Sequence, residues 1–402
     1  MIKTDLFQQL LDLGCDWKIQ DILVNKDFKE IDIYVHYTKS TCIFPGTDEE
    51  FDLYDFGSSR RVRHLDLFEY KTFINVRFPR VKNSKGDVRT IETDWIDKRV
   101  SFTYLFEKKV LETLDMSKNQ TKTAAYFDTT FDIVHSIMTR GVERGLRRRD
   151  FIGMWALGID EKSYGNGQKY ITVLSDPVTH RVLDIIEGRT TDDALELISW
   201  TVPPAQLDKI ELVAMDMWQP FMNAVGEIIP DADIVHDKFH TAKYLNKGVD
   251  NVRKQEVKEQ EILKNNKYLF MKNKENWTEK QRDKFEQINQ INLITAQAWK
   301  MKENFKEIYN LGRKQLCLSF FKKWYTDIVE SDIKPMIKVA DTILNHLKGV
   351  INSAVTYITN SAAENLNGQI QVVKTVGRGF ASVEGYRNSI LFFFGKLDMV
   401  PL

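Results

Sequence analysis

Five short apolar runs between residues 154 and 239 constrain the fold of this chain more than any other feature. They are rich in β-branched and aromatic residues and are bounded by turn residues, which is typical of strands. In order they read MWALGID, KYITVLSD, VLDIIEG, KIELVAMD and ADIVHDKF. Short turns such as YGNGQ and PVTH join the first three, which favours antiparallel pairing. The helical patterns DDALELISWTV and QPFMNAVGEII separate the later runs, which favours parallel pairing. We therefore predict a multidomain α/β protein with a five-stranded mixed sheet in residues 151–240.

The first and fourth of these runs end on the aspartates Asp160 and Asp216. An aspartate at the end of a buried strand is costly unless it is paired or binds a metal. The first and fourth strands can lie side by side, so the two carboxylates can meet at one edge of the sheet. A third acid, Glu364 in NSAAENLNGQIQ, lies in a helix-like segment that can pack on the sheet. Carboxylates that converge in this way can hold two Mg²⁺ or Mn²⁺ ions, as in metal-dependent phosphodiester chemistry.

Charge is distributed unevenly along the chain, although 57 Lys and Arg balance 57 Asp and Glu. Residues 151–242 carry 6 basic and 15 acidic residues, whereas residues 243–338 carry 21 and 13. An acidic block beside basic blocks is expected if one region binds metal and its flanks bind phosphate, and ordinary solvated faces are the alternative. The 3 cysteines are too few for a disulfide framework and indicate a reducing, intracellular setting. We find neither a signal peptide nor an apolar run near the roughly 20 residues of a membrane span.

The remaining sequence divides into four further segments. Residues 1–98 show a helix and a connector up to residue 30, followed by the strand-like runs IDIYVHY, TFINVRFPRV and RTIETDW. Residues 99–150 show three helical patterns, the last capped by Thr129 or Thr130, which predicts a helix-turn-helix. Residues 241–355 are Lys-rich and helical, so we interpret them as an insertion into the catalytic domain. Residues 356–402 return to that domain and carry Glu364.

Three long segments resemble one known family. IGMWALGIDEKSYGNGQKYITVLSD, VAMDMWQPFMNAVGEIIPDADIVHDKFH and NSAAENLNGQIQVVKTVGRGFASVEGYRNSILFF are similar to the ISL-type (ISL-three) family of bacterial insertion-sequence transposases. The resemblance extends from about residue 60 to the C-terminus. It implies a ribonuclease H-like catalytic domain whose triad positions are Asp160, Asp216 and Glu364. It also implies a role for Asp237 and His240 in DKFH, with an N-cap aspartate and a surface histidine as the alternative.

The N-terminal module departs from the family pattern. Many relatives begin with a zinc ribbon held by a CxxC pair and a later Cys and His. Here Cys42 stands at the first position, Pro45 at the second and Asn83 near the third. One thiol cannot satisfy the four ligands of a structural zinc, so we expect a degenerate ribbon without zinc.

DNA contacts are expected from basic residues in several segments. Arg378 in GRGF and Lys162 can contact phosphate, although a structural ion pair and a solvated lysine are the alternatives. Trp299 can stack on an unpaired base, but a tryptophan at helical spacing is more often part of a core. The other candidates are arginines of the strand-rich module and of the last helix of the predicted helix-turn-helix: Arg60, Arg61, Arg63, Arg140, Arg144, Arg147, Arg148 and Arg149.

The resemblance implies a DDE transposase that binds the terminal inverted repeats of an insertion sequence. It would cleave and join DNA strands with Mg²⁺ or Mn²⁺, act on target DNA, and work as a homodimer or larger synaptic complex. Its expected location is the bacterial cytoplasm, associated with the nucleoid and not with membrane. Two alternatives stay open: a catalytically silent DNA-binding protein derived from a transposase, and a structure-specific nuclease on the same fold.

Overall fold

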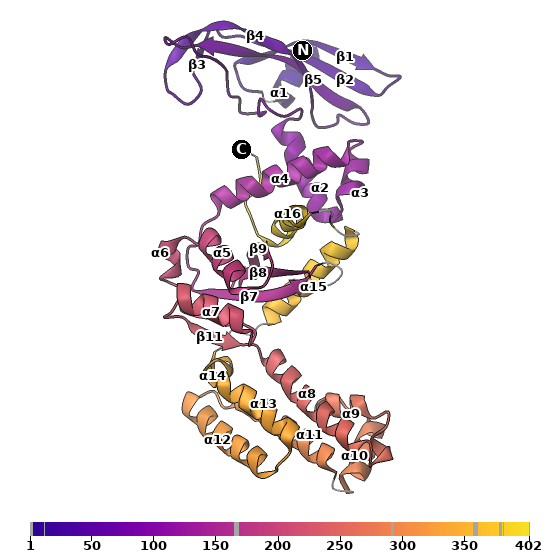
Figure 1. Ribbon diagram of the computed structural model, residues 1–402. Helices are drawn as coiled ribbons and strands as arrows, with labels where there is room; N and C mark the ends of the chain where they lie inside the picture. The colour runs from indigo at the N-terminus through magenta and orange to yellow at the C-terminus, as the bar shows by residue number, and fades with distance from the viewer. Residues whose placement is uncertain are drawn as a thin grey trace. The chain divides into compact units, whose positions relative to one another are not determined.

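The computed structural model describes residues 3–11, 13–164, 169–290, 293–356, 361–377, 380 and 382–401 (Figure 1). Contacts divide the chain into one unit of Met1–Arg149 with Leu397–Leu402 and a second unit of Asp150–Lys396. The last six residues therefore group with the first unit, whereas we expected them to belong to the segment that carries Glu364. Within the described ranges, no helix is long and apolar enough to cross a membrane.

The first unit begins with a short helix and a sheet. The helix is α1 (Lys3–Leu11), and the strand order is β1-β2-β5-β4-β3 with β6 paired to β5. The strands are β1 (Trp17–Asn25), β2 (Glu30–Tyr37), β3 (Thr41–Ile43), β4 (Glu50–Arg63), β5 (Lys71–Lys82) and β6 (Val88–Thr90). Alternate residues of β2, β4 and β5, such as Ile33, Val62 and Ile74, are fully buried on one face. The opposite face carries charged and aromatic side chains.

Three strands of this sheet, β1, β3 and β4, lie outside the predicted runs. β2 and β5 match two of those runs, but the third, RTIETDW, is a strand only at its start, in β6. β1 falls in the predicted connector, and β4 begins inside the predicted turn FPGTDEE. β1 is an edge strand with only Trp17 buried, so it lacks the apolar alternation that marks a strand. The acids of β4 stay in solvent or find partners, as Asp55 does with Arg80 (2.6 Å). The zinc-ribbon interpretation of this module stays a prediction.

Three helices complete the first unit. They are α2 (Tyr104–Ser117), α3 (Gln120–Tyr126) and α4 (Phe131–Arg148), close to the predicted ranges. Thr130 caps α4, because its side chain accepts a hydrogen bond from the backbone N–H of Ile133 (3.3 Å). The helices contact one another pairwise, but that packing alone does not make them a DNA-binding helix-turn-helix.

The second unit contains the predicted five-stranded mixed sheet. Its strands are β7 (Ala156–Ser163), β8 (Tyr170–Asp176), β9 (Arg181–Glu187), β10 (Leu212–Met215) and β11 (Asp233–His236). The order is β11-β10-β7-β8-β9, with β7, β8 and β9 antiparallel and β10 parallel to both β7 and β11. The pairing directions and the adjacency of the first and fourth strands are those expected from the connections.

Helices cover both faces of this sheet. α5 (Thr191–Thr201) and α7 (Gln219–Ile228) bury apolar residues against one face, and the one-turn α6 (Pro204–Leu207) connects α5 to β10. On the opposite face α16 (Val383–Phe394) contacts β9, where Arg387 forms a two-pronged ion pair with Asp184 (2.6 and 2.7 Å). α15 (Ser361–Val376) contacts β7, and α14 (Leu347–Val355) contacts β11.

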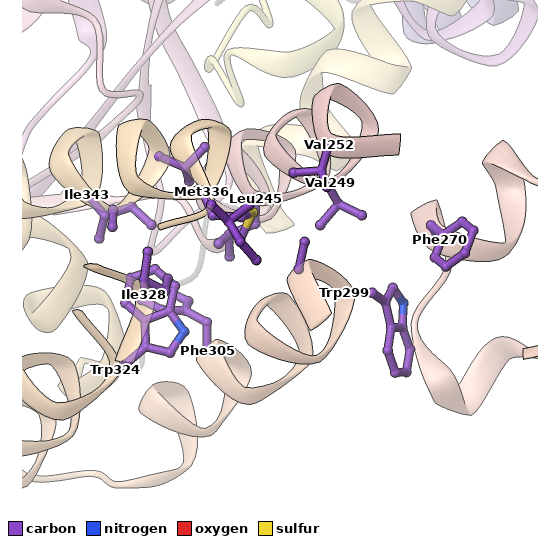
Figure 2. Close-up of a cluster of buried hydrophobic side chains, with 14 of the residues drawn as sticks. Leu245, Val249, Val252, Phe270, Trp299, Phe305, Trp324, Ile328, Met336 and Ile343 are labelled. Carbon is purple, nitrogen blue, oxygen red and sulfur yellow. The ribbon is translucent and has the colours of Figure 1, made fainter. Parts of the chain in front are cut away.

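The insertion is helical, as expected, and it has its own apolar core. Its α-helices before α14 are α8 (Lys238–Glu256), α9 (Lys267–Met271), α10 (Glu279–Gln290), α11 (Ile294–Phe305), α12 (Lys314–Glu330) and α13 (Lys334–Asn345). Three 3₁₀ turns, at Glu261–Leu263, Lys274–Asn276 and Lys306–Asn310, link them. Figure 2 shows part of this core, in which Phe305 and Trp324 pack together with ring centroids 4.6 Å apart.

Trp299 belongs to this core, which corrects its predicted role in stacking on DNA. Its side chain is 4% exposed and its ring stacks on Trp277 at 4.5 Å. Its indole N–H donates to the carbonyl of Lys272 (3.3 Å). Since neighbouring aromatic rings already cover it, Trp299 has no free face for a base, and the simpler core interpretation is correct.

Candidate active site

Strand register brings the two predicted catalytic aspartates together. β10 pairs with β7 so that Met215 lies opposite Ile159, and the next step along both strands places Asp216 opposite Asp160. Ala156 and Ala214 pack together on one face of the sheet. Asp160 and Asp216 follow them by an even number of residues, so both carboxylates project from that same face. Neighbouring strands lie about 4.8 Å apart, which puts the two carboxylates side by side. We expected Asp160 at the end of its strand, but β7 continues to Ser163, so Asp160 lies inside the strand.

A third aspartate continues the same row. β11 pairs with β10 so that His236 lies opposite Met215, and the next step places Asp237 opposite Asp216. Asp237 is buried, and it caps α8 by accepting the backbone N–H of Phe239 (3.0 Å). Asp237 is therefore the N-cap residue of α8, as the alternative interpretation held, and the pairing of β11 with β10 also places it beside Asp216.

His240, in the first turn of α8, contacts two members of the row. Its Nδ1 lies 2.5 Å from Oδ1 of Asp216 and 3.4 Å from Oδ2 of Asp237. Burial opposes protonation of the ring, but the two carboxylates outweigh burial and raise the pKa of His240 to about 9. These contacts favour the protonated ring, so His240 is a partner of Asp216 within the site and not a surface bystander.

Lys162 shares the face of Asp160, two residues further along β7. Burial lowers its pKa to about 8, Asp160 opposes this shift, and the nearby Lys374 adds to it. Lys374 belongs to α15, the helix that carries Glu364. The helix of Glu364 therefore passes beside the strand of Asp160. The side chain of Glu364 lies outside the described residues, as does Arg378, so their roles stay predictions.

The residues at this edge fit a hard divalent cation. Oxygen ligands from carboxylates are what Mg²⁺ prefers, and Asp160 and Asp216 supply them on adjacent strands. Oδ1 of Asp216 and Nδ1 of His240 are buried, and neither makes an aligned hydrogen bond among the described residues. Among the described residues, which do not include the side chain of Glu364, no three His, Cys, Asp or Glu side chains are arranged as a metal site.

Protein partners already occupy most of the arginines predicted to bind DNA. The sheet arginines bind their own module: Arg60 donates to the carbonyls of Lys98 and Val100, Arg61 binds Asp32 (2.7 Å) and Glu30 (2.7 Å), and Arg63 binds Asp66 (2.5 Å). On α4, Arg140 binds Asp97 (3.2 Å), Arg144 binds Glu107 (2.5 Å), and Arg148 binds Asp398 (3.1 Å). Arg147 is exposed and Arg149 is half-buried. DNA can therefore engage these six paired guanidinium groups only if they share or exchange their partners.

Sequence reasoning missed a cluster beside the aspartates. Arg189 follows β9 and binds Glu161, and its guanidinium lies over the rings of Tyr170 and Trp218. Glu161 adjoins Asp160, and Trp218 follows Asp216 by two residues. No local motif marks this cluster, because its members come from four separate segments; only the predicted strand order could have suggested that they meet.

Comparisons with known proteins identify the family of this chain. The model of a family described as a transposase, the ISL3-type DDE family, matches residues 157–390, which include Asp160, Asp216 and Glu364. The transposase for insertion sequence element IS1001 of Bordetella parapertussis is 25% identical over 343 residues, 83% of this chain and 82% of that protein. The transposase for insertion sequence element IS1557 of Mycobacterium tuberculosis is 22% identical over 365 residues, 82% and 80% of the two chains. Since the family model matches more than half of the sequence, the chain belongs to the ISL3-type family of DDE transposases.

Proposed function

We propose that this transposase cleaves and joins DNA at the ends of its insertion sequence, with Asp160, Asp216 and Glu364 as ligands of two Mg²⁺ or Mn²⁺ ions. The observation that carries the proposal is the register of Asp160 and Asp216 on adjacent parallel strands. When bound, two such ions stabilise the attacking and leaving oxygens of an in-line displacement. In this proposal the sheet and its covering helices form the ribonuclease H-like domain expected from the sequence.

Each residue around the aspartates has a separate task in this proposal. His240 neutralises and orients Asp216, since its charged ring contacts that carboxylate directly. Asp237 fixes the start of α8 and so fixes His240. Lys162 lies on the face of Asp160, where a lysine can donate to a phosphate oxygen of the DNA. Arg378 is a further candidate for that contact.

The first unit supplies the DNA binding in this proposal. Exposed Arg147 and the ion-paired arginines of α4, Arg140, Arg144 and Arg148, contact DNA phosphates. α4 is the candidate recognition helix of a helix-turn-helix. Terminal inverted repeats are the proposed substrate and duplex DNA the proposed target. Because two ends of one insertion sequence are processed together, we propose a homodimer or larger synaptic complex. A bacterial cytoplasmic, nucleoid-associated location follows from that substrate.

The test compares strand cleavage by the wild type with Asp160→Asn and Asp216→Asn. The substrate is a duplex that carries the terminal repeats of the insertion sequence, incubated with Mg²⁺. We expect each variant to lose cleavage by about a hundredfold or more while it still binds the duplex, because ligand placement is lost but phosphate contacts are kept. Asp208→Asn, at an exposed aspartate of the same unit, is the control. A wild-type protein that binds the ends and never nicks them would establish the silent DNA-binding alternative, and cutting of branched DNA without strand joining would establish the nuclease alternative.

A further inference from the structure

We propose that Arg189 is a positioning residue that ties together the segments following Asp160 and Asp216, and thereby sets the spacing of the two carboxylates. The proposal rests on the proposed metal-dependent function and adds a residue to it. Arg189 contacts neither aspartate in the described structure. It acts through Glu161 and Trp218, which adjoin them in the chain.

Arg189 joins the two segments through both its side chain and its backbone. Its Nη1 lies 3.1 Å from Oε2 and 3.4 Å from Oε1 of Glu161, the residue after Asp160. Its guanidinium carbon lies 3.8 Å from the ring centre of Tyr170 and 5.1 Å from that of Trp218. Its carbonyl accepts the indole N–H of Trp218 (3.2 Å), two residues after Asp216. One residue thus contacts both the segment that follows Asp160 and the segment that follows Asp216.

This cluster lies behind the aspartates. Successive residues of a strand point to opposite faces, so Glu161 points away from the face of Asp160. Tyr170 pairs with Ser163 and lies on the same face as Glu161. Trp218 is the N-cap residue of α7, which packs on that face. Arg189 is therefore placed to brace the strands and not to touch a ligand shared by Asp160 and Asp216.

The backbone of Arg189 is itself held in a fixed turn. Gly188 has a φ of 105°, and a side chain there would meet the carboxylate of Asp193 at 2.2 Å. Asp193 forms a capping box with Thr190, which accepts the N–H of Asp193 (3.2 Å) and donates its hydroxyl to that carboxylate (2.7 Å). Since α5 starts immediately after Arg189, the arginine projects from a rigid point of the sheet edge.

Rigid spacing matters because Mg²⁺ demands near-ideal octahedral geometry, whereas Ca²⁺ accepts a flexible set of ligands. Outer contacts that orient the ligands typically change metal affinity by about 10- to 100-fold when they are removed. Loss of Arg189 should therefore weaken Mg²⁺ binding more than Ca²⁺ binding. A side chain that only stabilises the fold would affect both ions equally.

The experiment measures metal binding to the full-length protein without DNA. Bound Mn²⁺ is followed by the loss of its free EPR signal, and Mg²⁺ or Ca²⁺ is added as competitor. We expect Arg189→Met to weaken Mg²⁺ competition about tenfold, with a smaller change for Ca²⁺. Arg189→Lys should lie in between, because lysine keeps the charge opposite Glu161 but loses the stacking on Tyr170 and Trp218. Glu161→Gln should act in the same direction and be non-additive with Arg189→Met.

Arg181→Met is the matched control, because Arg181 contacts the carboxylate of Asp176 (3.5 Å) at the opposite end of β9. It should leave both metal affinities unchanged. Wild-type Mg²⁺ affinity in Arg189→Met, together with lost metal binding in Asp160→Asn and Asp216→Asn, would overturn the role of Arg189 and leave the proposed function standing. Wild-type metal binding in the two aspartate variants would overturn the proposed function itself. If Arg189→Met fails to fold by circular dichroism, Arg189→Lys and Glu161→Gln decide the matter by the same ratio of Mg²⁺ to Ca²⁺ affinities.

Discussion

His64 is a buried histidine that makes the first unit sensitive to acid. Its side chain is 6% exposed and its Nδ1 lies 2.9 Å from the hydroxyl of Thr103. Burial lowers the pKa of His64 from 6.5 to about 4, Arg63 adds to the shift, and Asp66 opposes it. The unfolded chain takes up a proton below pH 6.5, whereas the folded unit does not. Stability is therefore complete above that pH and is lost as the pH falls toward 4, by about 3 kcal/mol in all.

Urea unfolding of the wild type and of His64→Gln at several pH values between 4 and 8 checks this prediction. The variant should be less stable than the wild type at pH 8, because it loses the contact with Thr103. Its unfolding free energy should then fall by about 3 kcal/mol less than that of the wild type on acidification. His36→Gln, at an exposed histidine of β2 in the same unit, is the control and should show the same loss of stability on acidification as the wild type. Parallel pH curves for the wild type and His64→Gln would show the assignment to be wrong.

The candidate site illustrates what sequence patterns can and cannot predict for single residues. Asp160 and Asp216 could be predicted because each follows a continuous apolar run, and a mixed sheet places such runs side by side. His240 was a weaker prediction, since a histidine in the first turn of a helix has many possible neighbours. Arg189 could not be predicted, because its partners are set by tertiary contacts between separate segments. Trp299 was misassigned because a buried and a ligand-binding tryptophan have the same helical spacing.

At the level of elements, the apolar content of each strand decided how well it could be predicted. Strands β7 to β11 are buried from both faces, so each appears as an apolar run. β1 and β4 have only one buried face or lie at an edge, so polar residues break their pattern. The helical insertion was predictable as helices, but their mutual packing was not. Long-range contacts, and not local preference, fix that packing.

The contact of α14 with β11 depends on the absence of a side chain at Gly349. A Cβ there would lie 2.3 Å from Cδ2 and 2.8 Å from Nε2 of the buried His236 ring. Asn352 adds a hydrogen bond to the carbonyl of Ile234 (2.9 Å), and Lys348 pairs with Asp233 (2.9 Å). We expect Gly349→Ala to destabilise the protein by about 1–2 kcal/mol, because overpacking outweighs the gain in helix propensity.

Gly226 offers a matched control for this contact. It lies inside α7, and an added Cβ there meets nothing within 4 Å. Gly226→Ala should therefore raise stability by up to about 1 kcal/mol, the opposite sign to Gly349→Ala. Thermal unfolding of the two variants measures the difference. If both substitutions stabilise the protein, α14 tolerates a side chain at this point and the close packing on His236 is not a constraint.

At the scale of the whole molecule, the end of the chain completes the first unit. Leu397 and Met399 lie against two glycines of α4, Gly141 and Gly145, where an added Cβ would come within 3.1 Å of Leu111 and 2.5 Å of Leu397 respectively. Arg144 donates to the carbonyl of Met399. No local sequence pattern predicts this contact, because α4 and residues 397–399 are separated in the sequence by about the length of the second unit.

Deletion of residues 397–402 should therefore weaken the first unit and spare the second. We expect a loss of about 2 kcal/mol, because removal of Leu397 and Met399 exposes the apolar surface of α4 that they cover. Hydrogen exchange should rise in α2 and α4 and stay unchanged in β7, β8 and β9. An equal rise in both units, or a rise in neither, would contradict this account.

A substitution at Gly145 separates the tail contact from other effects of the deletion. In the full chain, Gly145→Ala brings a Cβ within 2.5 Å of the Cβ of Leu397, so it should destabilise the first unit as the deletion does. In the shortened chain that neighbour is gone, and the same substitution should instead stabilise α4 by up to about 1 kcal/mol through helix propensity. The sign of the effect must therefore reverse between the two backgrounds. If Gly145→Ala destabilises both chains equally, the groove on α4 has another occupant than the chain's own end.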